Sequence, residues 1–418
     1  MNILAAEHLF KIFGRRPHRG VDALRRGADR EELRAHGLTA AVVDASFEVA
    51  AGEIFVVMGL SGSGKSTLIR MINGLHPATA GEVVIEGENL AALKGDDLRR
   101  VRREKISMVF QHFALLPHRT VGENAAYALT VQGVNRADRE ARAARALEMV
   151  GLAGWGGSMP AELSGGMQQR VGLARALAAE TDIMLMDEAF SALDPLIRRE
   201  MQDQLVDLQQ RLDKTIVFIT HDLNEAMRLG DRVAMMRDGR IEQVGTAEQI
   251  LNDPKNDYVA QFVQDVDRAK VLTAGAVMEP PAVVIGAEQG PRQAHRLIRE
   301  HQLGALPVVR RDRTPVGVVL PGEIAAAVRE GRDRLPLTER SATTVGLDTP
   351  LGDLLADAAR RESPLLVVDD AGRLAGLIPQ VTLLAALSHE QVDPLPTPAG
   401  GPPSSTDPLT DDTEVVAR

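Results

Sequence analysis

Short apolar runs recur along residues 50–245 and alternate with longer stretches of helical spacing. Three of these runs, at 53–58, 183–186 and 215–220, are mostly apolar, which is typical of strands buried on both faces of a sheet. Chains in which such strands alternate with helices fold as parallel sheets covered by helices. The pattern therefore predicts a mainly parallel α/β domain.

Other stretches add smaller elements to this domain. Residues 3–13 alternate polar and apolar side chains and predict an edge strand. The arginine-rich stretch 15–38 predicts a helical insertion on the surface. Residues 121–152 have a mostly helical pattern, with a break around Gly133.

A glycine-rich loop at 59–67 lies between the strand at 53–58 and a helical stretch at 68–72. Its spacing, G-x-x-x-x-G-K-[ST], lets successive backbone N–H groups line a nest for phosphates at a helix N-terminus. Lys65 would then reach the β- and γ-phosphates of a nucleotide, and Ser66 would offer an oxygen to Mg²⁺. A glycine-rich turn with a solvated lysine is the alternative. The candidate phosphate-binding residues are Gly59, Ser61, Gly62, Ser63, Gly64, Lys65, Ser66 and Thr67.

Carboxylates end the apolar run at 183–186. Central parallel strands deliver side chains to the carboxyl edge of a sheet, where Asp187 would hold Mg²⁺ through water and Glu188 would polarise the attacking water. The alternative is a strand followed by an acidic helix cap. His221 follows the strand at 215–220 and is placed at the same edge.

Ser164 is a plausible N-cap for a helix through Ala178, and alone it could be an ordinary capped turn.

Composition restricts the classes of function. The net charge of −10 argues against nucleic acid as the main partner, and the absence of cysteine excludes disulfides and thiolate metal sites. The N-terminus lacks the features of a signal peptide, and no run approaches the roughly 18 apolar residues that span a bilayer. We expect a soluble, cytoplasmic chain whose role at a membrane, if any, passes through a partner.

The order and spacing of these motifs, including Leu-Ser-Gly-Gly at 163–166 and Ser-Ala-Leu-Asp at 191–194, resemble the nucleotide-binding subunit of ABC transporters over residues 1–265. The resemblance implies a head-to-tail homodimer that sandwiches two ATP molecules. It also assigns roles across and within the dimer. Ser164, Gly165 and Gly166 would contact the nucleotide held by the other subunit, and the loop ending at Asp194 would cross the dimer. Gln111 would contact Mg²⁺ and relay the nucleotide state to a transmembrane permease. His221 would sense the γ-phosphate.

An aromatic side chain for adenine stacking is expected near the N-terminus in this family. Phe13 fits the Lys-x-aromatic-Gly stretch at 11–14, although the insertion at 15–38 lengthens its path to the phosphate loop. Phe10 is the competing candidate, and a core role for either is an equal alternative.

The C-terminal third contains a repeat. Residues 306–309 and 317 reappear at 365–368 and 376 with one offset of 59 residues, and duplicated units of this size pack together to bury a shared core. The pattern resembles a pair of CBS domains, which are α+β units, over residues 274–388. The serine or threonine and the aspartate with which such pairs bind adenosyl ligands are missing, so we expect no such ligand.

Two charged stretches accompany the repeat. Residues 292–340 carry ten arginines against six acids, which predicts either a solvated face or a cationic surface for anionic lipid headgroups. The proline-rich acidic tail at 391–418 is expected to be disordered.

A cassette without membrane spans joined to a CBS pair is similar to the ATPase subunits of osmoprotectant importers, including the glycine betaine/proline system. The resemblance implies ATP and Mg²⁺ as cofactors, a separate permease, and an external binding protein that delivers the solute. Importers of another solute, such as choline, carnitine or an amino acid, remain alternatives, as does a non-transport ABC ATPase.

Overall fold

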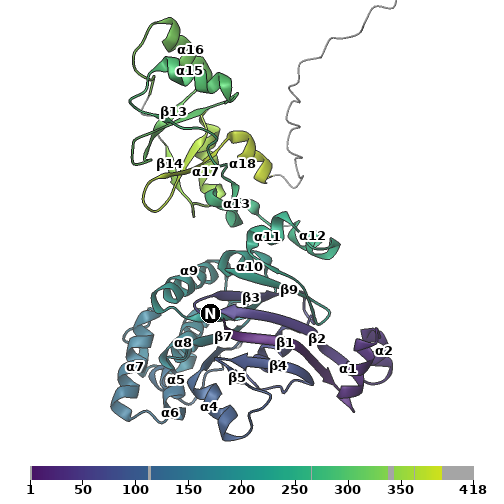
Figure 1. The fold of residues 1–418 in the computed structure, drawn as a ribbon. Helices are drawn as coiled ribbons and strands as arrows, with labels where there is room; N and C mark the ends of the chain where they lie inside the picture. Colours follow the sequence, from purple (N-terminus) through teal and green to yellow (C-terminus); the bar gives the residue numbers. More distant parts are fainter. Residues whose placement is uncertain (1, 112–113, 265, 338–342, 362, 388–418) are drawn as a thin grey trace, which may run out of the picture.

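The computed structural model describes residues 2–111, 114–264, 266–337, 343–361 and 363–387. The tail expected at 391–418 lies outside the described residues. Figure 1 shows an N-terminal cassette, a smaller C-terminal unit, and short helices between them. These linking helices are α11 (Ala247–Asn252), α12 (Asp257–Val263) and α13 (Arg268–Val271).

The larger sheet of the cassette has the strand order β10-β9-β3-β8-β7-β6. Strands from β9 to β6 run parallel, and β10 runs antiparallel to β9. Every residue of β3, β7 and β8 is buried, which confirms the prediction from their apolar runs. The strands are β3 (Ile54–Met58), β6 (Ile106–Val109), β7 (Ile183–Asp187), β8 (Thr215–Thr220), β9 (Arg232–Arg237) and β10 (Arg240–Gly245).

A second, antiparallel sheet has the order β2-β1-β4-β5, with β1 (Asn2–Phe13), β2 (Thr39–Ala50), β4 (Ala80–Ile85) and β5 (Glu88–Asn89). The prediction of an edge strand at 3–13 is wrong, because β1 pairs with β2 on one side and with β4 on the other. Alternation of polar and apolar side chains shows that one face of a strand is exposed. It carries no information about which strands pair with its two edges. Phe47 stacks on Phe55 at 5.0 Å and joins the two sheets.

The arginine-rich stretch 15–38 contains two helices, α1 (Pro17–Arg25) and α2 (Arg30–Ala35). Val21, Leu24 and Leu33 on these helices form a small core with Phe10 of β1. The insertion therefore covers one end of the antiparallel sheet, seen at the right of the cassette in Figure 1.

Helices cover the larger sheet on one face, and α3 with the antiparallel sheet covers the other. Alternate residues of β3 show this division, since Val56 belongs to the core beneath α8 and α9 while Val57 packs with Leu68 of α3. The helices are α3 (Lys65–Ile72), α4 (Asp96–Glu104), α5 (Val121–Ala125), α6 (Tyr127–Val131), α7 (Arg136–Met149), α8 (Gly165–Ala178), α9 (Pro195–Leu212) and α10 (Leu223–Leu229), with short 3₁₀ turns at Trp155–Gly157 and Pro160–Glu162.

The C-terminal unit follows α14 (Ala274–Val277) and contains the same series of elements twice. Each copy has a three-stranded sheet in which the first pair of strands is parallel and the second antiparallel. The first copy contains β11 (Ile285–Gly286), α15 (Pro291–Glu300), β12 (Leu306–Val309), β13 (Pro315–Val319) and α16 (Pro321–Arg329). The second contains β14 (Thr344–Gly346), α17 (Leu351–Ala359), β15 (Leu365–Val368), β16 (Leu374–Ile378) and α18 (Gln380–Leu387).

The two copies differ in what they pack against. Leu351 and Leu354 of the second copy belong to the same buried cluster as the cassette helices, and the N–H of Leu351 donates to the carbonyl of Leu272 at 2.9 Å. The first copy has a core of its own around Ile285 and Leu306. The second copy is therefore the part of the repeat that is joined to the cassette.

Asn124 of α5 holds the loop that leads into that helix. Its side chain is fully buried, accepts from the N–H of Leu116 at 2.7 Å, and donates to the carbonyls of Leu116, Arg119 and Thr120 at 3.0–3.1 Å. Asn124→Ala would leave these backbone groups buried without partners. We expect it to lower the free energy of unfolding by about 2–4 kcal/mol.

Urea unfolding of the full chain, followed by circular dichroism, measures this effect. Asn135→Ala is the matched control, because it removes one exposed N-cap of α7 and should cost only about 1 kcal/mol. Equal midpoints for the two variants would contradict the assigned role of Asn124.

Candidate active site

The glycine-rich loop joins β3 to the N-terminus of α3. Gly59 and Gly64 have φ of 155° and 109°, and a Cβ atom on them would lie 2.1 Å from the carbonyl oxygen of Met236 and 2.2 Å from that of Ala41. Neither neighbour is a flexible side chain, so only glycine fits at these two positions. The loop therefore packs closely against the sheet and leads into the start of α3.

Lys65, the first residue of α3, is buried within this loop. Its Nζ donates to the carbonyls of Gly59 at 2.7 Å and Leu60 at 3.1 Å. Burial lowers the pKa of Lys65, and the charges of Glu188 and Asp187 oppose that shift. The hydroxyl of Ser63 is also buried and, among the described residues, has no hydrogen-bond partner. An unpaired donor in the same loop as a buried ammonium group fits a phosphate oxygen.

Asp187 ends β7 next to the start of α3. Its Oδ1 accepts a hydrogen bond from Ser66 Oγ at 3.1 Å. Burial raises the pKa of Asp187, while the Ser66 hydrogen bond and Arg70 act to lower it. Within the described residues no group of three or more histidines and carboxylates could enclose a metal. Mg²⁺ is commonly bound by one or two protein oxygens with phosphates and water, so this pair fits Mg²⁺ delivered with a nucleotide.

Glu188 follows at once and adopts a left-handed backbone, with φ of 47°. Its N–H donates to the carbonyl of Ile219 at 2.9 Å. Its Oε2 accepts from Gln111 Nε2 at 3.3 Å and lies 3.1 Å from His221 Nδ1. Backbone strain of this kind persists where the surroundings fix the residue, and it gathers at functional sites. The structure thus brings Gln111, Glu188 and His221 together from three adjacent strand ends.

Ser164, Gly165 and Asp194 lie apart from this cluster and are exposed. Ser164 caps α8 by accepting from the N–H of Met167 at 3.3 Å, which confirms the predicted N-cap. Asp194 caps α9 by accepting from the N–H groups of Leu196 and Ile197 at 3.2 and 3.1 Å. Gly166 is half-buried against Ile197. Among the described residues, the hydrogen bonds of Ser164, Gly165, Gly166 and Asp194 do not reach the phosphate loop.

Comparison with known proteins places this geometry in a family. The ABC transporter model matches residues 42–191, and the CBS domain model matches residues 274–330. The glycine betaine/carnitine transport ATP-binding protein of Listeria monocytogenes is 48% identical over 94% of this chain and 99% of its own. The glycine betaine/proline betaine transport system ATP-binding protein of Escherichia coli is 44% identical over 93% and 98%.

The chain belongs to the ABC transporter family, as an ATP-binding subunit. A solved dimeric ATP-binding cassette in a post-hydrolysis state, bound to ADP and phosphate, has a TM-score of 0.50 and 32% identity, covering 58% of this chain and 98% of that one. These findings confirm the predicted fold class, an ABC cassette followed by CBS sequence. None of the described helices is long and apolar enough to cross a membrane.

The two aromatic candidates in this ABC subunit have different environments. Phe10 is 3% exposed within the core of the insertion and offers no free ring face. Phe13 is 41% exposed, meets His76 edge-on at 5.8 Å, and has Lys11 Nζ 5.1 Å from its ring. Of the two, Phe13 alone has a surface on which a base could stack.

Sequence reasoning missed one residue beside the site, Arg198 on α9. Its guanidinium donates to the carbonyls of Leu193 at 3.2 Å and Ser191 at 3.5 Å, and lies 3.4 Å from Asp222. It therefore ties the loop at 191–194 to the residue after His221. The sequence feature that could have indicated Arg198 is its position one helical turn after the N-cap Asp194, on the same face of α9.

Glu188→Gln should abolish most ATP turnover and leave ATP binding intact. Glutamine keeps the shape and the contact with Gln111 but cannot accept a proton from water. We expect phosphate release to fall by at least about 100-fold, the lower end of what a general base contributes. Calorimetric titration with ATP measures the binding.

Glu104→Gln, at the end of α4, is the control for loss of a carboxylate and should keep normal turnover. Turnover of Glu188→Gln within about threefold of wild type would contradict the role of Glu188.

Proposed function

We propose that this chain is the ATP-hydrolysing subunit of an importer for glycine betaine or a related quaternary amine. The observation that carries the proposal is that betaine-transport subunits are similar to both parts of this chain. The match to the Listeria protein covers 99% of that protein. Carnitine and proline betaine are the closest alternatives, because related subunits have these solutes in their names. An importer of choline or an amino acid is a further alternative, and a non-transport ATPase is less well supported.

ATP binding is assigned to the loop at 59–67. Its backbone amides and Lys65 hold the phosphates, with Ser61, Gly62 and Thr67 completing the loop, and Phe13 stacks on adenine. Ser66, Asp187 and Gln111 would hold Mg²⁺, which supplies positive charge to the phosphates. Glu188 orients and deprotonates the attacking water. His221, which contacts the Glu188 carboxylate, responds to the γ-phosphate.

A head-to-tail homodimer completes each site. Ser164, Gly165 and Gly166 of the partner subunit then face the phosphate loop, and the loop ending at Asp194 crosses the dimer. Support comes from the exposure of Ser164 and Gly165 at the positive end of a 14-residue helix, and from the dimeric state of the similar solved cassette.

The permease contact is assigned to a cavity of about 340 Å³ beside β6, α6 and α8. Phe110, Tyr127 and Val131 line it and are 37%, 38% and 54% exposed. Apolar side chains left exposed together mark a protein-binding surface. Phe110 adjoins Gln111, which donates a hydrogen bond to Glu188. Movement of a permease segment at this cavity would therefore be transmitted to Glu188. In this arrangement the subunit is peripheral on the cytoplasmic face, and an external binding protein delivers the solute.

Uptake of labelled glycine betaine tests the proposal. Cells lacking their own betaine uptake would carry the complete importer with wild-type subunit, Lys65→Ala, or Lys94→Ala as the exposed-lysine control. We expect uptake in the wild type and the control and none in Lys65→Ala, with faster uptake at high external salt. Lysine-dependent uptake without a salt response would keep the importer and reject its regulation by salt. No uptake in the wild type would discard glycine betaine as the solute.

The first C-terminal copy suggests how salt could act. Arg310, Arg311 and Arg313 are exposed at the turn between β12 and β13. We propose that they dock on anionic lipid headgroups at low ionic strength and hold the importer inactive, because salt screens such contacts.

Replacing all three arginines with glutamine should lower the salt concentration at which ATP turnover is half-activated, measured on the importer in anionic vesicles. Glutamine at Arg15, Arg16 and Arg19 removes the same charge elsewhere and should leave that concentration unchanged. Equal salt dependence in wild type and the first triple variant would reject the lipid contact.

A further inference from the structure

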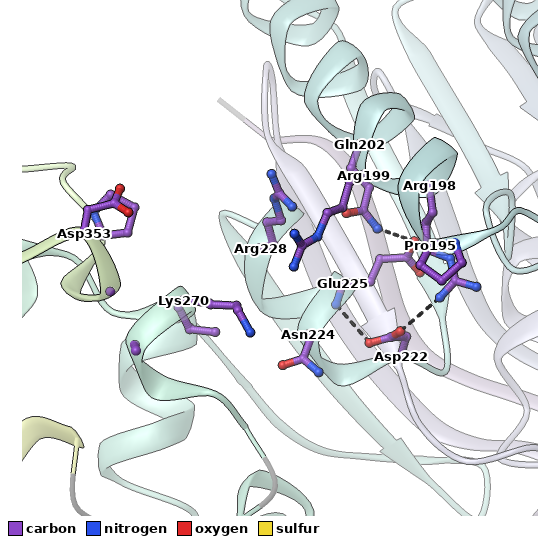
Figure 2. A pocket seen from close by; sticks show the side chains of 14 residues that line it. Pro195, Arg198, Arg199, Gln202, Asp222, Asn224, Glu225, Arg228, Lys270 and Asp353 are labelled. Atoms are coloured by element: carbon purple, nitrogen blue, oxygen red, sulfur yellow. Dashed lines mark hydrogen bonds and ion pairs between the residues drawn. The ribbon is translucent and has the colours of Figure 1, made fainter. Parts of the chain in front are cut away.

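The carboxylate of Glu225 on α10 is buried where α10 meets α9 and the end of β8. The residue is 6% exposed, and burial raises its pKa, while hydrogen bonds from Thr220 and Gln202 oppose that shift. Its Oε1 accepts from Nε2 of Gln202 on α9 at 3.0 Å, and its Oε2 accepts from the hydroxyl of Thr220. Figure 2 shows Glu225 lying between Gln202 and Asp222. The carboxylate thus ties the end of β8 to α9.

The hydroxyl of Thr220 also holds the backbone around His221. It accepts a hydrogen bond from the N–H of Asp222 at 3.0 Å, which closes a short ring across His221. A hydroxyl has one proton, and Thr220 donates that proton to Glu225, so a lone pair is left to accept from Asp222. Glu225 therefore sets the direction of the hydroxyl that spans His221.

The carboxylate of Glu225 does not have the role that its place in the helix would give it. A glutamate at the third position of a helix ordinarily accepts from the N–H of the N-cap residue. The N-cap of α10 is Asp222, and its N–H donates to Thr220 instead. Helix capping therefore does not explain why this carboxylate is buried.

The ring of His221 depends on its backbone for its position. Its side chain is 55% exposed, and its Nδ1 lies 3.1 Å from Oε2 of Glu188. The residue before it is held through Glu225, and Asp222 after it pairs with Arg198 of α9 at 3.4 Å. A shift of either neighbour would move the ring relative to Glu188.

We infer that Glu225 is a positioning residue for ATP hydrolysis, which holds His221 beside Glu188, and that Gln202 anchors Glu225 to α9. The inference rests on the hydrolysis proposed above. Because α9 begins directly after Asp194, the same anchor connects His221 to the loop that is assigned to the dimer contact.

Turnover and ATP affinity of the full chain, measured together on Glu225→Gln, test the inference. Glutamine has one acceptor oxygen where the carboxylate has two, so it cannot accept from both Thr220 and Gln202. Because a displacement of about 1 Å is costly in rate, we expect turnover to fall at least about tenfold while ATP affinity stays within about twofold. Glu53→Gln is the matched control, since it removes a carboxylate that is 7% exposed at the opposite end of β3, and it should leave turnover unchanged.

Exchange of the two side chains should restore activity. In the double variant Gln202→Glu with Glu225→Gln, the amide on α10 can donate to the carboxylate on α9 and accept from Thr220. Both hydrogen bonds then form again, and we expect turnover to recover.

Two further measurements separate positioning of His221 from a general loss of structure. In a His221→Ala background, Glu225→Gln should change the residual turnover by less than about twofold, because residues that act as a unit are not additive. The ring resonance of His221 in nuclear magnetic resonance spectra, assigned by its absence from His221→Ala, should move in Glu225→Gln and return in the exchanged pair.

Normal turnover of Glu225→Gln, an equal loss in Glu53→Gln, or an unmoved His221 resonance would overturn the inference. So would a further loss of about tenfold in the His221→Ala background. Absence of turnover in the wild type would reject the proposed hydrolysis, and the resonance would still decide whether Glu225 positions His221.

Discussion

The carboxyl ends of β6, β7 and β8 meet at one edge of the larger sheet, and the candidate chemistry depends on that convergence. Strand pairing fixes the spacing of these ends, since Val109 pairs with Met186 and Asp187 with Ile219. The left-handed backbone at Glu188 then turns one carboxylate oxygen toward both Gln111 and His221. A shift of any strand by one residue would turn its side chains to the opposite face and separate the three groups.

Sequence patterns were sufficient where local chemistry determines structure. The apolar runs gave β3, β7 and β8, the glycine spacing gave the loop between β3 and α3, and the offset of 59 residues held for every strand of the repeat. They failed where the answer depends on distant neighbours. The central position of β1 follows from its pairing with β2 and β4, and neither partner can be recognised from the alternation within β1.

The same limit applies to the surroundings of the site. Arg198 contacts Asp222 because α9 and the loop before α10 come together in space, and no local motif encodes that meeting. Phe10 and Phe13 are three residues apart with similar flanking residues, yet the insertion buries one ring and leaves the other exposed. Tertiary packing decided both outcomes.

The sharing of one buried cluster by the cassette and the second C-terminal copy has a consequence for biosynthesis. The ribosome makes the cassette first, then the first copy, and only then Leu351 and Leu354, which complete the cluster. Apolar surface on the linking segment around Leu272 and Ala274 therefore stays uncovered while roughly 80 further residues are made, which takes several seconds at ordinary synthesis rates. A nascent chain of this kind would benefit from a chaperone during that interval, and a message truncated after the first copy would yield a protein with an exposed apolar surface.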